Sequence, residues 1–297
     1  MRYRFLICDV FTSQRFGGNQ LAVLPEASGL SDAQMQQIAR EFNFSESTFV
    51  LPSATCTRQV RIFTPKEELP FAGHPNVGTA FVLATIGELG EIGESTTVTF
   101  DEKAGRVPVQ VRREGSGFRC VLSAPQPLSI GKSVDSALVA AAVSVSPSDI
   151  VTTTHPPQAA SVGLPFVFAE VADRGVLGRM RVNIPGFEAI GAQGVPPNVL
   201  FYTRDAGDFD VRARMFSPLD GILEDPATGS ANCALGAMLC QYHDPGDGTF
   251  SRRIAQGVEM GRPSVLFAEA DKRGGKAVAA RIGGDSVMVC DGYLEIS

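Results

Sequence analysis

The chain has 297 residues, of which 44% are hydrophobic and 20% are charged, and its net charge at pH 7 is −6. This composition is typical of a globular protein of about two domains with a well-formed core, and it argues against intrinsic disorder. The negative charge, with Lys and Arg scattered along the chain, argues against binding to nucleic acid or to an anionic membrane.

Several common sites and signals are missing from the sequence. The six cysteines are dispersed without a C-x-x-C pair and the three histidines lie far apart, so the sequence predicts neither a disulfide framework nor a metal site. It contains no phosphate-binding or dinucleotide-binding glycine loop and no G-x-S-x-G elbow. Charge comes too early for a signal peptide, and no apolar run approaches the roughly 20 residues of a membrane span. We therefore expect a cytoplasmic protein that uses no metal and no cofactor.

Apolar runs and turn residues predict a mixture of strands and helices in the first half. Ser31 and Gln34 form a capping box before an apolar stripe, which predicts a helix at residues 32–42. A second helix is expected at residues 75–86. The expected strands are 5–8, 21–24, 47–51, 58–63, 96–100, 107–112 and 119–122.

The second half repeats this mixed order, with a long helix expected from Pro226. The other expected elements are a short helix before Gly186 and strands at 166–171, 199–203, 210–216, 264–269, 277–282 and 287–289. A proline-containing loop at 123–132 marks the natural domain boundary. We expect one domain at residues 1–124 and a second at 125–286, with the closing strand 287–297 returning to the first.

A short pattern occurs twice, about half the chain apart. Arg-apolar-Phe-(Thr/Ser)-Pro at residues 61–65 returns at 214–218, and Pro-x-x-Gly-(Thr/Ser)-Ala at 75–80 returns at 226–231. Such an internal repeat indicates two related halves, with a cleft between two like lobes. The sequence thus predicts an α/β (α+β) fold of two pseudo-symmetric domains, with one long helix central to each.

Each Pro-x-x-Gly segment is expected to begin a helix. Proline suits the first helical position, so Pro75 and Pro226 mark the two starts, and Asp225 stands where an N-cap belongs. Glycine in a helix costs about 1 kcal/mol relative to alanine, so Gly78 and Gly229 indicate close approach of a ligand or of the partner helix. The free N–H groups of both starts favour a carboxylate or phosphate. The alternative is that both segments are packing features inherited by duplication.

Three side chains are candidates for chemistry. Glu46 lies between Phe44 and Phe49, and apolar surroundings disfavour a charged carboxylate and so suit it to proton transfer. A solvent-facing glutamate in a loop is the alternative. His74 is either a functional residue or a half-exposed loop histidine. Asp225 is first of all an N-cap, and orienting a substrate would be an added role.

Motifs along nearly the whole chain resemble those of the PhzF-like family of phenazine biosynthesis. The matching segments are Asp9-Val10-Phe11-Thr12, Gly18-Asn19, Ala22-Val23, Ser45-Glu46-Ser47-Thr48-Phe49, Phe71-Ala72-Gly73-His74-Pro75, Gly78-Thr79-Ala80, Gly163-Leu164-Pro165, the run from Glu224 to Ala231, Gln256-Gly257, Gly261-Arg262-Pro263-Ser264 and Gly283-Gly284. The two Pro-x-x-Gly segments together make the resemblance specific.

This resemblance implies a diaminopimelate-epimerase-like fold, in which each domain wraps a mixed sheet around a central helix, usually in a homodimer. The family's characterised activity is a cofactor-free isomerisation of trans-2,3-dihydro-3-hydroxyanthranilate, in which a glutamate moves a proton between ring carbons. Glu46 falls on that glutamate, and His74 and Asp225 are expected to act with it. The expected substrate-binding residues are Ser45, Gly73, Gly229 and Ser230.

The related epimerases and proline racemases use a pair of cysteines at the two helix starts. Here both starts lack cysteine, and Cys233 lies further along the second segment, so two-cysteine racemisation is disfavoured. Three functions stay open: this proton-shifting isomerase of a small carboxylic acid, an enzyme of the same fold that acts on another small acid, and a non-catalytic protein that binds a small anion.

Overall fold

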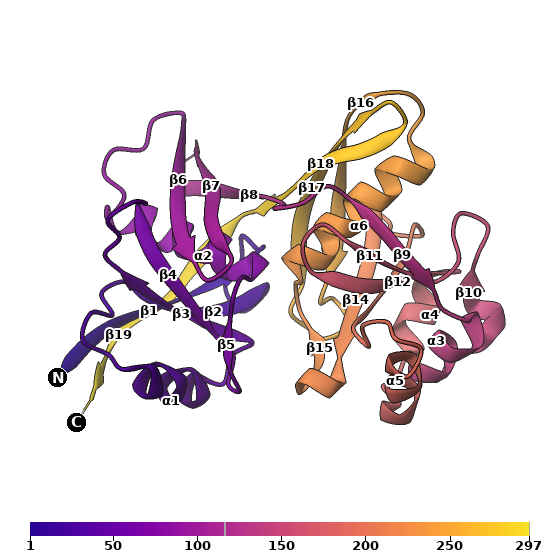
Figure 1. Ribbon diagram of the computed structural model, residues 1–297, viewed down its shortest axis with the longest axis horizontal. Helices are drawn as coiled ribbons and strands as arrows, with labels where there is room; N and C mark the ends of the chain where they lie inside the picture. The colour runs from indigo at the N-terminus through magenta and orange to yellow at the C-terminus, as the bar shows by residue number, and fades with distance from the viewer. Residues whose placement is uncertain (116, 297) are drawn as a thin grey trace. The chain divides into compact units, whose positions relative to one another are not determined.

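The computed structural model describes residues 1–115 and 117–296, which form two compact units. Unit 1 consists of Met1–Ser123 with Gly283–Ser297, and unit 2 consists of Ala124–Ile282. Each unit is a mixed sheet with one long buried helix, as the ribbon shows (Figure 1). The predicted α/β fold class is therefore confirmed.

Unit 1 contains two helices and nine strands among the described residues. These are β1 (Arg2–Val10), β2 (Asn19–Leu24), α1 (Asp32–Phe42), β3 (Glu46–Leu51), β4 (Arg58–Phe63), β5 (Glu68–Leu69), α2 (Gly73–Thr85), β6 (Ser95–Glu102), β7 (Gly105–Glu114), β8 (Gly117–Ser123) and β19 (Ser286–Glu295).

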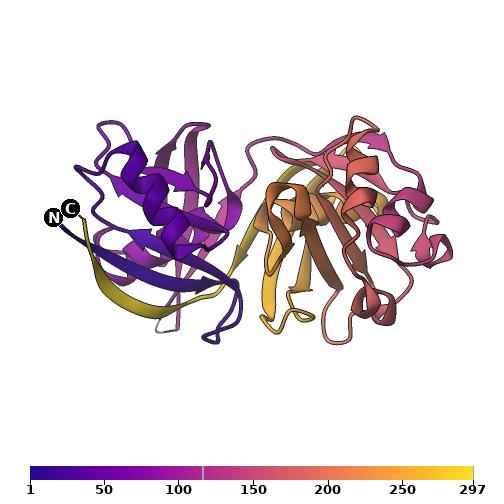
Figure 2. The same cartoon turned by 90° about the horizontal axis from the view of Figure 1, so that it is seen from below.

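The sheet of unit 1 runs in the order β19-β1-β2-β3-β4-β6-β7-β8, with the short β5 also paired to β4. The β2–β3 and β4–β6 pairs are parallel, and the others are antiparallel. The last strand, β19, runs beside β1, which places the two ends of the chain side by side (Figure 2). The Ile296 N–H donates to the Met1 carbonyl over 2.7 Å.

The two helices of unit 1 lie in different layers. Helix α1 has the expected capping box of Ser31 and Gln34 and packs against β3 and β4. Helix α2 is buried from Gly73 to Ala84 and contacts β1, β2, β3, β7, β8 and β19, so the sheet curves around it. A helix that is apolar on every side requires such an enclosed position.

Gly78 allows α2 to approach the sheet closely. A Cβ at this position would lie 2.6 Å from Leu21 Cδ2 and 2.7 Å from Val10 Cγ2. The sequence suggested a ligand or a partner helix as the reason for this glycine, but the neighbours are strands β1 and β2. Gly78 lies in the second turn of α2, one turn later than expected, because the helix begins at Gly73.

Gly78→Ala is expected to lower the free energy of unfolding by about 1–3 kcal/mol, because the added methyl group overpacks the contact with Leu21 and Val10. Gly178→Ala in unit 2 is the matched control. Gly178 is also helical, and nothing lies within 4 Å of the place that a Cβ would take there, so this change is expected to stabilise by up to about 1 kcal/mol. Urea unfolding of both variants measures the difference, and equal stabilities would contradict the steric explanation.

Unit 2 contains a longer series of elements. These are β9 (Ser129–Ser133), α3 (Ser136–Ala142), η1 (Pro147–Asp149), β10 (Ile150–Val151), β11 (Gln158–Ser161), β12 (Pro165–Val171), α4 (Arg174–Arg179), α5 (Ile184–Gly191), β13 (Val199–Thr203), β14 (Val211–Ser217), η2 (Pro218–Asp220), β15 (Ile222–Asp225), α6 (Gly229–His243), β16 (Gly248–Gln256), β17 (Ser264–Arg273) and β18 (Lys276–Gly284).

The strands of unit 2 follow the same plan as those of unit 1. The order is β9-β11-β12-β13-β14-β16-β17, with β12–β13 and β14–β16 parallel and β15 paired to β14. Helix α6 takes the place of α2 and contacts β11, β12, β16 and β17. The shorter helices α3, α4 and α5 contribute to a separate apolar core of unit 2.

An arginine contact that occurs in both units confirms the first of the two repeated patterns. Arg61 of β4 donates from Nε and Nη2 to the two carboxylate oxygens of Glu68 over 2.7 and 2.8 Å. Arg214 of β14 makes the same two-bond contact with Glu224 over 2.8 and 2.7 Å. The guanidinium groups also lie over Phe63 and Phe216. The repeated Arg-x-Phe sequence thus builds the same contact twice.

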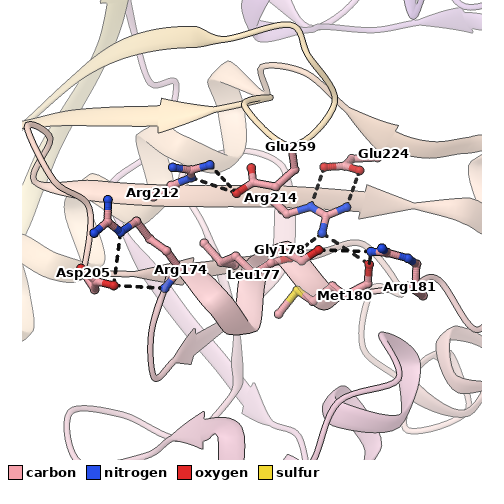
Figure 3. Close-up of polar contacts among 10 residues, drawn as sticks. All are labelled: Arg174, Leu177, Gly178, Met180, Arg181, Asp205, Arg212, Arg214, Glu224 and Glu259. Atoms are coloured by element: carbon pink, nitrogen blue, oxygen red, sulfur yellow. Dashed lines mark hydrogen bonds and ion pairs between the residues drawn. The ribbon is translucent and has the colours of Figure 1, made fainter.

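In unit 2 this arginine also binds the end of a helix (Figure 3). Arg214 Nη1 donates to the carbonyls of Leu177 and Met180, where α4 ends. Because the last carbonyls of a helix have no partner within the helix, a buried cation there satisfies them. Arg214 therefore ties α4 to strands β14 and β15.

The expected helix starts at the two prolines are wrong. Helix α2 begins at Gly73 and α6 begins at Gly229, with Thr228 as its N-cap residue. Asp225 is the last residue of β15 and not an N-cap. The reason is a set of tertiary hydrogen bonds, because Gln256 donates to the Asp225 carbonyl over 2.7 Å and accepts from the Thr228 N–H over 3.2 Å. These bonds hold the Asp-Pro segment outside the helix.

Candidate active site

Glu46 and His74 meet at the start of the central helix of unit 1. Glu46 is the first residue of β3, and His74 is the second residue of α2. Glu46 Oε2 lies 3.6 Å from His74 Nδ1, and the side chains are 13% and 5% exposed. Asn19, the first residue of β2, places its Nδ2 3.4 Å from the same ring nitrogen. The carboxylate is therefore shielded and is not a solvent-facing loop residue.

His74 is a neutral imidazole at physiological pH. Burial lowers the pKa of His74 to about 3, and a hydrogen bond with the backbone of Gln20 opposes this shift only in part. The contact with Glu46 is therefore not an ion pair. His74 Nε2 is buried and makes no hydrogen bond with any described residue. A neutral imidazole has one nitrogen that donates and one that accepts, so His74 can take part in a hydrogen-bond network without carrying charge.

A buried hydroxyl pair fixes the strand that carries Glu46. Thr48 lies two residues after Glu46 and therefore on the same side of β3. Its Oγ1 is 2.9 Å from Thr79 Oγ1 of α2. This bond links β3 to the helix that carries His74, so the two candidate groups are held by rigid elements. Ser45 precedes β3, and Gly73 is the first residue of α2.

The other three predicted site residues lie in unit 2, at the end of β15 and at the start of α6. Asp225 accepts a hydrogen bond from Thr228 Oγ1 over 2.5 Å. Gly229 and Ser230 are the first two residues of the helix. The Ser264 hydroxyl donates to the Pro226 carbonyl over 2.9 Å, so the loop before the helix is closely held.

The pairing of strands shows which residues occupy equivalent places in the two units. Glu46 pairs with Leu21 in the parallel β2–β3 ladder. The next residue, Ser47, pairs with Phe63 of β4. In unit 2, Phe216 is the repeat of Phe63, and it pairs with Val199 of β13. The residue before Val199 is Asn198. Asn198 therefore stands where Glu46 stands, and it cannot exchange protons as a carboxylate does.

The helix starts also differ. Counted from the first helical residue, Ser230 of α6 is equivalent to His74 of α2, and Gly229 is equivalent to Gly73. Glu68 and Glu224 are equivalent, because each accepts two hydrogen bonds from the repeated arginine. The residue after each is Leu69 in unit 1 and Asp225 in unit 2. Only unit 1 carries a carboxylate beside a histidine at these equivalent positions.

Cysteine chemistry does not fit either helix start. Cys233 is the fifth residue of α6, and burial raises the pKa of its thiol to about 12. A thiol with this pKa is not a thiolate at neutral pH.

Among the described residues there is also no group of three or more His, Cys, Asp or Glu side chains that could hold a metal ion. Within the same residues no helix has the length and apolar character needed to cross a membrane.

Comparison with known proteins identifies the family. The sequence profile of the phenazine biosynthesis-like proteins, PhzC-PhzF, matches residues 8–292. The chain belongs to the PhzC-PhzF family. The resemblance read from the sequence motifs is therefore confirmed, and with it the assignment of the chain to a family of isomerases.

Two curated relatives of the PhzC-PhzF family match over almost their full length. An uncharacterized isomerase of Mesorhizobium japonicum is 38% identical over 98% of this chain and 98% of its own. A trans-2,3-dihydro-3-hydroxyanthranilate isomerase of Pseudomonas chlororaphis is 34% identical over 98% of this chain and 99% of its own.

Solved structures agree on the fold. The PhzF-family phenazine biosynthesis protein of Bacillus anthracis superimposes with a TM-score of 0.91 at 24% identity, and the match covers 100% of both chains. A hydroxyproline epimerase of Agrobacterium vitis superimposes with a TM-score of 0.62 at 16% identity, over 99% of this chain and 92% of its own. The predicted diaminopimelate-epimerase-like fold of this PhzC-PhzF protein is thereby confirmed.

Proposed function

We propose that this chain is a cofactor-independent isomerase that shifts a proton on a small carboxylic acid, with Glu46 as the acid–base group. The observation that carries this proposal is the contact of Glu46 with the buried, neutral His74 at the start of α2. Family membership supports an isomerase, and the geometry supports a shielded carboxylate that is fixed by its neighbours.

The difference between the two units favours a reaction with one base. A racemase that uses two bases needs one on each face of the reacting carbon. The positions equivalent to Glu46 and His74 are Asn198 and Ser230, neither of which is a base at neutral pH. One carboxylate that takes a proton and returns it to another carbon needs no second base.

The steps balance without any oxidant or reductant. The Glu46 carboxylate removes a C–H proton, and the electron pair of that bond spreads into the conjugated system of the acid. The neutral Glu46 then returns the proton to a different carbon. Positioned proton transfer of this kind contributes about 10²- to 10⁴-fold to a rate.

The remaining site residues bind and orient in this proposal. The N–H groups of Gly73 and His74 lie in the first turn of α2, where a carboxylate or developing negative charge is favoured. Ser45 is assigned to the substrate beside Glu46. In unit 2, Asp225, Gly229 and Ser230 are proposed as further substrate contacts, with Asp225 accepting hydrogen bonds from substrate donors. These residues are proposed because they match the family's sequence motif.

The first substrate to test is trans-2,3-dihydro-3-hydroxyanthranilate, because a relative with 34% identity is named for its isomerisation. Proton NMR in D₂O is expected to show loss of this compound, appearance of its isomer and incomplete uptake of deuterium at the carbon that receives the proton. Retained protium would indicate that one carboxylate carries the proton from carbon to carbon.

A second candidate is the same proton shift on another small acid, and the 38% identity to an uncharacterized isomerase favours testing it. The same NMR assay is applied to a panel of unsaturated and cyclic carboxylic acids. Conversion of a panel member but not of the anthranilate compound would select this second candidate. A folded protein that converts none of them and exchanges none of their C–H protons would overturn the proposed isomerase.

A further inference from the structure

Glu102 is a buried carboxyl group outside the site described above. It is the last residue of β6 and is 8% exposed. Neither of its oxygens makes a hydrogen bond of normal geometry with any described residue. Burial raises the pKa of Glu102 to about 8, and the nearby Asn76 side chain opposes this shift only in part. Glu102 is therefore mainly the neutral acid at pH 7.

The neighbouring Asn76 belongs to the first turns of α2. Its Nδ2 donates to the Ala72 carbonyl over 2.9 Å, whereas its Oδ1 is buried without a hydrogen bond among the described residues. A neutral Glu102 has a hydroxyl that can donate to such an acceptor, but an ionised Glu102 has none. The Ala104 N–H also donates to the Pro70 carbonyl over 3.0 Å, so the turn after Glu102 is bonded to the loop before α2.

Unit 2 has a glutamine at the equivalent position. The parallel β4–β6 and β14–β16 pairs have the same register, which makes Gln256 the counterpart of Glu102. Asn232 is the counterpart of Asn76, and its Nδ2 donates to the Thr228 carbonyl over 2.9 Å and to Gln256 Oε1 over 2.6 Å. Gln256 Nε2 donates in turn to the Asp225 carbonyl over 2.7 Å.

Glutamine is always neutral and always has both a donor and an acceptor. A glutamic acid side chain of the same shape has both only when it is protonated. In unit 2 the glutamine and the asparagine together hold the segment that leads into the helix. The repeat therefore indicates the task of Glu102 in unit 1.

We propose that Glu102 is a positioning residue for the isomerase, which as the neutral acid holds the start of α2, and with it Gly73 and His74, through Asn76. This inference rests on the proposed function of the Glu46 and His74 site. When Glu102 ionises, it loses its hydrogen-bond donor, and a charge appears in a buried place beside the helix start. The arrangement of His74 then changes, and turnover falls.

The groups around Glu102 do not account for its protonation. The charged or titratable side chains on its own hairpin and on β4, β5 and α2 are Asp101, Lys103, Arg106, Arg112, Arg113, Glu114, Arg58, Arg61, Glu68 and His74. None of them shifts the pKa of Glu102, which responds to burial and to Asn76 alone. Lys103, the nearest cation in the sequence, is paired with Glu68 over 2.5 Å.

The sign of the pH dependence follows from the raised pKa. Below about pH 8 Glu102 is neutral and the site is intact, and above it the carboxylate forms. Isomerase activity of the wild type is therefore expected to fall about tenfold per pH unit beyond this point. Glu102→Gln is expected to keep activity at pH 7 within about twofold and to lose this decline, because glutamine has no proton to release.

Asp101→Asn is the matched control, since it removes one negative charge from the adjacent, less buried residue of β6. This variant is expected to keep the decline above pH 8. A Glu102→Gln protein with the same decline as the wild type would overturn the proposal. So would a folded Glu102→Gln protein that is inactive at pH 7 while the wild type is active.

A second readout does not depend on any substrate. The chain has three histidines, so selective ¹⁵N labelling gives three rings, and His74→Gln assigns the signal of His74. Because its own pKa is about 3, His74 does not titrate between pH 6 and 10. A step in its signal near pH 8 in the wild type and Asp101→Asn, absent in Glu102→Gln, is the expected result. No step, or an unchanged step in Glu102→Gln, would overturn the positioning role even if the isomerase activity itself is not found.

Discussion

Replacing Glu46 by glutamine is expected to lower turnover by about 10²- to 10⁴-fold while leaving substrate binding within a few-fold of the wild type. Glutamine has the size of glutamate and can still contact His74, but it cannot take a proton from carbon. The loss should therefore appear in kcat and not in the dissociation constant. Single-turnover NMR in D₂O measures the first, and titration calorimetry of the inactive variant measures the second.

Glu41→Gln is the control for this experiment. Glu41 is an exposed residue of α1, close to Glu46 in sequence, and the substitution is identical. Its turnover is expected to match the wild type. Circular dichroism must show that both variants fold. If Glu46→Gln keeps turnover within a few-fold, another group moves the proton, and the role assigned to Glu46 fails.

Local sequence signals predicted those elements that depend on local physics. The capping box at Ser31 and Gln34 and its apolar stripe indicated residues 32–42, the bounds of α1. Helices α2 and α6 could be predicted from their runs of apolar residues, which are buried on all sides of each helix. Glu46 was found because phenylalanines flank it at the junction of α1 and β3.

Signals that depend on tertiary contacts were missed or misread. Asp225-Pro226 is a typical N-cap followed by a first helical residue, but Gln256 binds that backbone and the helix begins at Gly229. Strand β16 was not predicted, because Ser251, Arg252 and Arg253 interrupt its apolar pattern. Its strand conformation is explained by its antiparallel pairing with β17. Asn19 lies 3.4 Å from His74 because α2 packs against β2, a contact between segments far apart in the sequence.

Glu102 illustrates a property that no local pattern could indicate. In the sequence it stands between Asp101 and Lys103 in a turn region, where an exposed charge is the ordinary expectation. Its neighbour Asn76 belongs to α2, which lies earlier in the sequence. The signal that could have found it is the internal repeat, once Glu102 is aligned with Gln256 as its counterpart in unit 2.

The two units share a scaffold and differ in chemistry. Both have the arginine–glutamate pair and the asparagine that binds the backbone at the helix start. The positions that can exchange protons are the ones that differ, with Glu46 against Asn198. One unit can therefore supply the base while the repeated contacts keep both helix starts rigid. This division agrees with a single carboxylate that moves a proton on one face of its substrate.

Arg214→Met is expected to be the most destabilising single change among those considered, lowering the free energy of unfolding by about 3–5 kcal/mol. The substitution leaves the Glu224 carboxylate without its two-bond partner and the carbonyls of Leu177 and Met180 without their donor. The Arg214 and Glu224 side chains are 8% and 15% exposed, so water replaces these bonds poorly. Chemical denaturation by guanidinium chloride, followed by far-UV circular dichroism, measures the change.

Two further variants separate burial from charge. Arg174→Met breaks the pair with Asp205, whose side chains are 47% and 46% exposed, and exposed pairs contribute at most about 1 kcal/mol. This control lies in the same region of unit 2 (Figure 3). The double variant Arg214→Met with Glu224→Met removes the uncompensated carboxylate and is expected to recover part of the loss. If Arg214→Met unfolds at the same denaturant concentration as Arg174→Met, the buried arginine does not hold α4 to the sheet as its hydrogen bonds indicate.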